Sequence, residues 1–240
     1  MLGRFLEVSV AAPDVAESLS FYESLGFVQA LVGDIWSHPY AVVTDGRLVL
    51  GLHQQETFPP GLTWMHPDLA DHRQTLLHAG IELQSATLDD DSFHQIGFLD
   101  PTGLPINLIE ARTFTPATVA ATFSSGLGYF EEFGIPTRDP VGCAEFWERL
   151  GLVAFEPEWK PFKKVPVTAR DISIALYDID LRRPVMSFSV AQLAERVAGF
   201  RDRGYRFAAL PDGLSPAASA LLEAPEGSLL LLTEESQDPN

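Results

Sequence analysis

The feature that most constrains the fold is an internal repeat relating the two halves of the 240-residue chain. The segment DVAESLSFYESLG at residues 14–26 is matched by DPVGCAEFWERLG at residues 139–151, 125 positions later. Further landmarks recur 124 positions later: Gly80 as Gly204, Pro101 as Pro225 and Gly103 as Gly227. Self-similarity of this kind predicts two copies of one domain, at residues 1–112 and 126–240, joined by a linker at residues 113–125.

Each half itself contains two similar segments. Residues 14–26, 68–80, 139–151 and 192–204 all begin with Asp or Gln and end with Gly. An Asp at a helix start accepts hydrogen bonds from free amides, and a Gly just past the end adopts the left-handed conformation at little cost. Val15, Leu19, Tyr22 and Leu25 recur at helical spacing in the first segment. The chain is therefore predicted to contain four helices of similar length.

Strands are predicted around each helix. Before the first helix, residues 5–10 alternate between the set Leu6, Val8, Val10 and the set Phe5, Glu7, Ser9. After it, residues 41–44 and 47–53 flank an Asp-Gly turn, which is typical of a hairpin. Each module therefore reads β-α-β-β-β, and we predict an α+β fold built from four such modules.

Composition excludes several classes of partner. The formal net charge is −17, which repels phosphate backbones, so no nucleic-acid partner is expected. The sequence contains no run of about 18 apolar residues, so no membrane helix is predicted. The first residues lack the separate charged, apolar and cleavage regions of a signal peptide. Cys143 is the only cysteine, so no internal disulfide can form. These features predict a cytoplasmic protein without a membrane partner.

Four segments resemble the vicinal-oxygen-chelate superfamily, which includes glyoxalases, bleomycin-resistance proteins and extradiol dioxygenases. They are APDVAESLSFYESLGF, DGRLVLGLH, FLDPTGLPINLIE and, in the second half, RDPVGCAEFWERLGL. The resemblance implies that paired modules join their sheets into two open half-barrel domains whose concave faces hold ligand. Because this superfamily hosts several chemistries, the fold alone does not define the reaction.

In metal-using relatives, the resemblance implies four concave positions that carry His, Glu or Gln. Matched by strand register, they fall on Glu7, Gly51, Gly61 and Asn107 in the first domain and on Glu132, Ala175, Val185 and Leu230 in the second. One carboxylate per domain falls short of the three ligands of a typical catalytic site, so no bound metal is predicted. The alternative is a divalent ion, Fe, Mn, Ni or Zn, held by Glu7 with His53 or Asn107.

Glu7 and Glu132 are the candidate catalytic residues, because a partly desolvated carboxylate is a general acid or base. The alternative is a carboxylate that is merely paired or hydrated. His53 shares a strand face with Glu7, and its counterpart in the second copy is Tyr177; both are candidate ligand contacts or else strand-end residues.

Aromatic residues before the third strand are further candidates for ligand binding. Trp36, His38 and Tyr40 in the first half are echoed by Trp159 in the second. They would stack on a planar ligand or, alternatively, belong to a core or a dimer interface. The only three lysines, at positions 160, 163 and 164, either recognise an anion or form a solvated hairpin.

The leading functional prediction is a glyoxalase- or bleomycin-resistance-like protein that binds a small hydrophobic or aromatic molecule as a monomer or homodimer. The alternative is a metal-dependent lyase or isomerase, or a ring-cleaving dioxygenase. In a third possibility one copy only supports the other or a dimer interface, and the second copy is the candidate because its concave face carries fewer polar residues.

Overall fold

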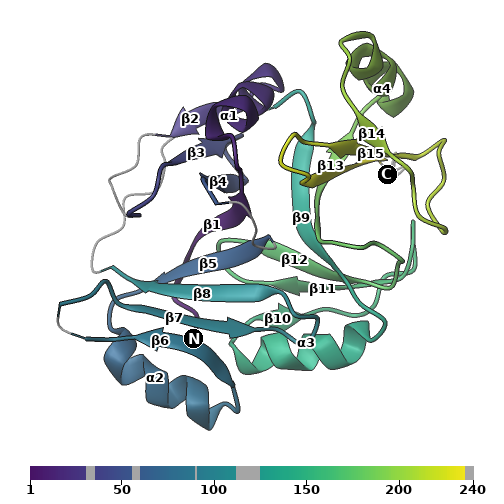
Figure 1. Cartoon of the computed structure of the whole chain (residues 1–240). Coiled ribbons are helices and arrows are strands. Elements are labelled where there is room, and N and C mark those ends of the chain that lie inside the picture. Colours follow the sequence, from purple (N-terminus) through teal and green to yellow (C-terminus); the bar gives the residue numbers. More distant parts are fainter. Residues whose placement is uncertain (31–35, 56–59, 90, 112–124, 236–240) are drawn as a thin grey trace.

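The computed structural model describes residues 1–30, 36–55, 60–89, 91–111 and 125–235 (Figure 1). Most of the predicted linker at residues 113–125 lies outside these ranges. None of the described helices combines the length and apolar character needed to cross a membrane.

The elements follow the predicted order four times. The first module is β1 (Arg4–Ala11), α1 (Val15–Ser24), β2 (Val28–Ala30), β3 (Tyr40–Thr44) and β4 (Val49–His53). The second is β5 (Gly61–His66), α2 (Leu69–His78), β6 (Leu83–Thr87), β7 (Gln95–Leu99) and β8 (Pro105–Glu110). The third is β9 (Tyr129–Pro136), α3 (Pro140–Arg149), β10 (Val153–Ala154), β11 (Lys164–Thr168) and β12 (Ser173–Tyr177). The fourth is β13 (Val185–Val190), α4 (Leu193–Asp202), β14 (Phe207–Ala208), β15 (Ser219–Glu223) and β16 (Leu229–Glu234).

The strands form two eight-stranded sheets of the same topology. Their orders are β2-β3-β4-β1-β5-β8-β7-β6 and β10-β11-β12-β9-β13-β16-β15-β14, and neither sheet closes into a barrel. In the first sheet β1 runs parallel to β4 and antiparallel to β5; in the second, β9 does the same with β12 and β13. The predicted α+β class with two open sheets is confirmed.

Three of the four helices begin as predicted. The side chains of Asp14, Asp68 and Asp139 each accept a hydrogen bond from an amide in the first turn of their helix. Helix α4 begins differently, because Gln192 has a φ of 57° and its side chain makes no cap. The carboxylate of Glu234 instead accepts the amide hydrogens of Gln192 and Leu193. A neighbouring strand thus supplies the anion that favours this helix start.

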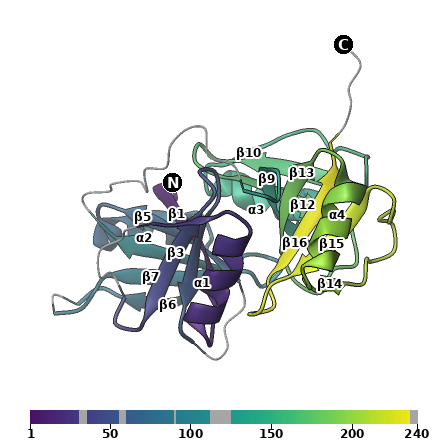
Figure 2. The same cartoon turned by 90° about the horizontal axis from the view of Figure 1, so that it is seen from above.

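The two domains contact each other through side chains of the equivalent helices α1 and α3. Helix α1 lies beside the strands of the second sheet (Figure 2). Tyr22 of α1 donates a hydrogen bond to Glu226, in the turn between β15 and β16, at 2.7 Å. Its counterpart in α3, 125 positions later, is Trp147, whose ring centroid lies 6.2 Å from that of Trp64 in β5. One continuous hydrophobic core contains side chains from both domains. The docking therefore depends on buried side chains of both halves.

The sheet faces opposite the helices differ between the domains. In the second domain a separate apolar cluster covers this face and contains no helix residue. Its buried members are Phe162, Ala175, Tyr177, Ile179, Val185, Leu214, Leu221, Leu229 and Leu231. In the first domain the equivalent face carries polar and aromatic side chains instead, which makes it the better place for a functional site.

Candidate functional site

A buried carboxylate–imidazole pair lies on the face of the first sheet opposite the helices. Glu7 of β1 is 1% exposed and His53 of β4 is 3% exposed. Nε2 of His53 lies 2.7 Å from Oε1 of Glu7. Since an ionised carboxylate can only accept, this nitrogen carries the hydrogen and donates it. Sequence alternation placed the two residues on one face, and the structure brings them into direct contact.

Three further groups extend the pair into a chain of hydrogen bonds. Ser9 Oγ donates to Oε1 of Glu7 at 2.9 Å and lies 2.8 Å from Thr63 Oγ1. Because the single hydroxyl hydrogen of Ser9 points to Glu7, Thr63 must be the donor to Ser9. On the other side, His38 Nε2 lies 2.9 Å from Nδ1 of His53. When His53 is neutral, His38 donates to it, and every hydrogen bond runs toward Glu7.

The pKa of His38 is lowered, first by burial and then by the neighbouring His53, with the charge of Glu7 opposing both effects. A lowered pKa favours the neutral imidazole at neutral pH. A neutral His38 ring that donates to His53 through Nε2 has no hydrogen on Nδ1, so with His53 neutral the outer end of the chain is a hydrogen-bond acceptor.

Aromatic rings surround the two imidazoles. Tyr40 stacks on His53 with ring centroids 5.5 Å apart, and Trp36 meets His53 edge-on at 5.1 Å. Phe93, which is 46% exposed, lies 6.4 Å from the Trp36 ring. Trp36 Nε1 is buried and has no hydrogen-bond partner in the part of the chain that the structure describes. The structure thus gathers three of the predicted ligand contacts, Trp36, His38 and Tyr40, around His53.

Gly51 leaves the space that the Glu7 carboxylate occupies. A Cβ atom at position 51 would overlap with the carboxyl carbon and both carboxylate oxygens of Glu7. The side chain of Glu7 therefore folds over the backbone of the neighbouring strand β4. Any larger residue at position 51 would force the carboxylate away from His53.

The strand register differs from the predicted one at three positions. Thr63, and not Gly61, pairs with Glu7. In the second domain Ser187, and not Val185, pairs with Glu132, and Leu231, and not Leu230, pairs with Ser187. Asn107 does lie at its predicted position, next to Thr63 in register, and is half-buried.

The corrected first-domain set is Glu7, Gly51, Thr63 and Asn107, which offers one carboxylate, one hydroxyl and one amide. The nearest imidazole, His53, has both ring nitrogens in hydrogen bonds. Among the residues that the structure describes, no group of three or more His, Cys, Asp or Glu side chains is arranged to hold a metal. This donor set does not fit the transition metal that the resemblance implies, because such sites normally use three His, Cys or carboxylate ligands.

The second domain repeats the carboxylate–ring pair with other partners. Tyr177 donates a hydrogen bond to Oε1 of Glu132 at 2.8 Å, as His53 does to Glu7. The ammonium of Lys164 lies 2.6 Å from the same oxygen. Burial, and next the charge of Glu132, raise the pKa of Tyr177 well above its usual value, so the phenol keeps its hydrogen. Trp159 is 70% exposed and does not join this cluster.

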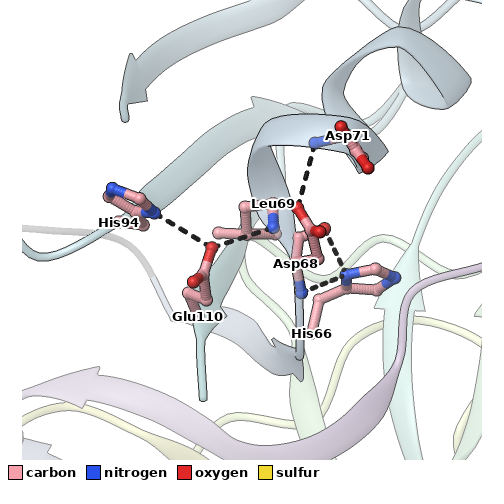
Figure 3. A network of polar contacts seen from close by, with 6 residues as sticks. All are labelled: His66, Asp68, Leu69, Asp71, His94 and Glu110. Atoms are coloured by element: carbon pink, nitrogen blue, oxygen red, sulfur yellow. Dashed lines mark hydrogen bonds and ion pairs between the residues drawn. The ribbon is translucent and has the colours of Figure 1, made fainter. Parts of the chain in front are cut away.

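A second polar network of the first domain was not found from the sequence (Figure 3). Glu110 of β8 accepts the amide hydrogen of Leu69 at the start of α2, and His94 Nδ1 lies 3.0 Å from the same carboxylate oxygen. The contact between Glu110 and Leu69 repeats the one between Glu234 and Leu193 at α4. We therefore assign Glu110 to stabilisation of the helix start.

His72 of α2 is an unusual member of this region. Its ring stacks on that of His66 with centroids 4.0 Å apart, and it is only 8% exposed. Burial, followed by the charges of His66 and the N-terminal amine, lowers the pKa of His72 to about 4. The folded protein therefore favours the neutral form of this side chain.

Acidification is expected to destabilise the fold through His72. The unfolded side chain binds a proton near pH 6.5, whereas the folded one does so only near pH 4. Between these values the unfolded state holds more protons, so stability falls as the pH falls from about 6.5 to 4, by roughly 1–3 kcal/mol. Urea unfolding at several pH values would measure this loss. His72→Gln should flatten the profile, whereas His78→Gln, at an exposed position of the same helix, should not; equal profiles for the two variants would contradict the assignment.

No protein-family model matches the chain, and no curated protein matches it in sequence. Solved structures do resemble it. An extradiol ring-cleaving dioxygenase from B. fuscum has a TM-score of 0.64 and 14% identity, over 99% of this chain and 72% of that one. The 2,3-dioxygenase LapB from Pseudomonas sp. KL28 has a TM-score of 0.62 and 14% identity, over 100% and 96%. The Mn(II)-bound glyoxalase from Novosphingobium aromaticivorans has a TM-score of 0.62 and 13% identity, over 98% and 82%.

These identities are low, so the likeness concerns the fold alone. It extends over nearly the whole chain and over both of its sheets. The chain thus has the fold seen in extradiol dioxygenases and in a glyoxalase.

Proposed function

We propose that the protein binds a small aromatic or hydrophobic molecule at the first domain and that its metal site is degenerate. The observation that carries this proposal is the chain of hydrogen bonds that ends at Glu7. This carboxylate is stabilised by Ser9 and His53, in the place where the resemblance implies a metal. Hydrogen bonds from the protein thus do what a metal ion would do for the buried negative charge.

The ligand would contact the outer members of the cluster, because Glu7 itself is buried. Trp36 and Phe93 offer ring faces or edges for a planar molecule. His38 would accept a hydrogen bond from the ligand through Nδ1. Apolar walls with a few directed polar groups are typical of small-molecule sites.

Thermal-shift screening of the purified protein against a library of aromatic compounds tests the proposal. Gly51→Ala is expected to reduce the affinity for any hit at least tenfold, because the added methyl group displaces Glu7 and so disturbs His53 and His38. Gly199→Ala is the matched control, since a Cβ atom there meets nothing within 4 Å and favours the helix. Hits that bind both variants equally would contradict the proposed location.

Metal analysis of the same preparation separates this proposal from a metal-dependent enzyme. Stoichiometric Fe, Mn, Ni or Zn that is lost on Glu7→Ala would favour the lyase, isomerase or dioxygenase, with Glu7 and either His53 or Asn107 as ligands. Such a result would overturn the degenerate-site proposal even if aromatic compounds also bind.

A further inference from the structure

The apolar cluster over the second sheet is not made by strand residues alone. Leu214, in the connection between β14 and β15, is 7% exposed and belongs to this cluster. Ile179, in the connection between β12 and β13, belongs to it as well. On the sheet the cluster contains Leu231, whose counterpart 124 positions earlier is Asn107. Side chains of connecting segments thus cover the face that corresponds to the polar face of the first domain.

The connection between β14 and β15, residues 209–218, forms a strap in which one leucine makes the main inward contact. Leu210 is only partly buried, and of residues 211–217 only Leu214 is buried. In the described part of the chain, the hydrogen bonds of residues 211–217 stay within the strap, such as the one from the Leu214 amide to the Pro211 carbonyl at 3.3 Å. The strap is therefore held on the sheet by apolar burial and not by strand pairing.

The turn before Leu214 directs this side chain inward. Gly213 has a φ of 98°, although a Cβ atom there would meet nothing within 4 Å. Glycine is therefore favoured at this position by the backbone conformation and not by lack of space. The equivalent connection in the first domain, residues 88–94, has no buried residue in its described part, and its Phe93 is 46% exposed. Only the strap of the second domain covers its sheet in this way.

We infer that the strap is a latch: Leu214 occupies the place of a ligand in the second domain, and the strap opens locally to admit a compact apolar molecule of about the size of benzene. Burial of one leucine side chain favours the closed form by roughly ten- to a hundredfold. Opening breaks no strand pairing, so it belongs to the low-energy local motions of a fold. The inference does not depend on a ligand in the first domain, because strap and covered face both belong to the second.

Hydrogen exchange followed by mass spectrometry tests the local opening. Peptides that contain Leu214 should exchange at least tenfold faster than peptides from β16. Gly213→Ala strains the turn without a steric clash and should raise the exchange rate of the strap about five- to thirtyfold further. Gly204→Ala is the matched control, since its φ is 83° and its Cβ atom also meets nothing within 4 Å; it should leave the strap unchanged. Strap exchange that occurs only together with that of β16, or equal effects of the two variants on the strap, would overturn the inference.

Leu214→Ala tests whether the covered face takes a ligand. This variant should bind fluorobenzene at least tenfold more tightly than the native protein in a ¹⁹F NMR titration, because the shortened side chain leaves an apolar space above the sheet. The native titration records any binding at the first domain. Leu210→Ala, in the same strap but only partly buried, is the control and should bind as the native protein does. No gain in Leu214→Ala, or an equal gain in both variants, would overturn the inference. Loss of the native circular dichroism spectrum in Leu214→Ala would do so as well, because a latch leaves the sheet without unfolding it.

Discussion

His53→Leu is expected to lower the free energy of unfolding by about 3 kcal/mol or more. Glu7 is 1% exposed and its Oε1 accepts hydrogen bonds from His53 and Ser9. Leucine fills a similar volume but removes the stronger donor, so a buried charge is left with one hydroxyl. Breaking a buried charged pair from one side typically costs 3–5 kcal/mol. Denaturant unfolding followed by circular dichroism gives this quantity directly.

Two variants show whether the loss comes from the carboxylate. His53→Leu combined with Glu7→Gln should be more stable than His53→Leu alone, because the neutral amide no longer needs a counter-charge. Tyr177→Phe removes the equivalent donor from the second domain, where Lys164 continues to neutralise Glu132, and should cost only about 1 kcal/mol. Equal losses for His53→Leu and Tyr177→Phe would show that Glu7 finds another partner.

Short-range patterns in the sequence sufficed for much of the fold. Asp followed twelve residues later by Gly specifies where a helix begins and ends, and three of the four predicted capping residues do cap. Strand alternation likewise placed Glu7 and His53 on one sheet face. These features depend on residues that are close in sequence, so single-sequence reasoning reaches them.

The register could not be predicted because the connections differ in length. Seven positions separate Glu7 from the capping Asp14, whereas five separate its partner Thr63 from the capping Asp68. Counting back equally from each helix therefore selected Gly61, two positions away. On β16 the predicted residue was one position away from the observed one. This difference matters more, because a shift of one residue moves the side chain to the other face of the sheet. Leu230 belongs to the core under the helices, whereas Leu231 belongs to the opposite face.

The side chains that pair with the buried glutamates also could not be predicted from the sequence. Lys164 of β11 reaches Glu132 of β9 across one intervening strand, β12, and nothing in the lysine cluster distinguishes position 164 from position 163. The inward orientation follows from strand pairing, in which Lys164 lies opposite Tyr177. Long-range pairing of this kind is fixed by the sheet and not by local pattern.

Trp147→Ala is expected to lower the free energy of unfolding by about 3–5 kcal/mol. It should also make the unfolding of the two domains less cooperative. Trp147 is fully buried in α3, next to Trp64 of the other domain, within the continuous core. Truncation of a buried tryptophan leaves a cavity that the surroundings refill only in part. Because this cavity lies between the domains, their unfolding should separate into two transitions in denaturant, where the native protein shows one.

Trp159→Ala provides the control, since its ring is 70% exposed and lies outside the core. It removes a tryptophan of the same size, yet surface substitutions usually change stability by no more than about 0.5 kcal/mol. Circular dichroism is the suitable probe, because both variants lose tryptophan fluorescence. If Trp147→Ala unfolds at the same denaturant concentration as Trp159→Ala, the domains do not depend on this contact. If Trp147→Ala unfolds at a lower denaturant concentration and in two steps, the domain that unfolds first is the one that depends on the other. The remaining domain is then the copy that supports it.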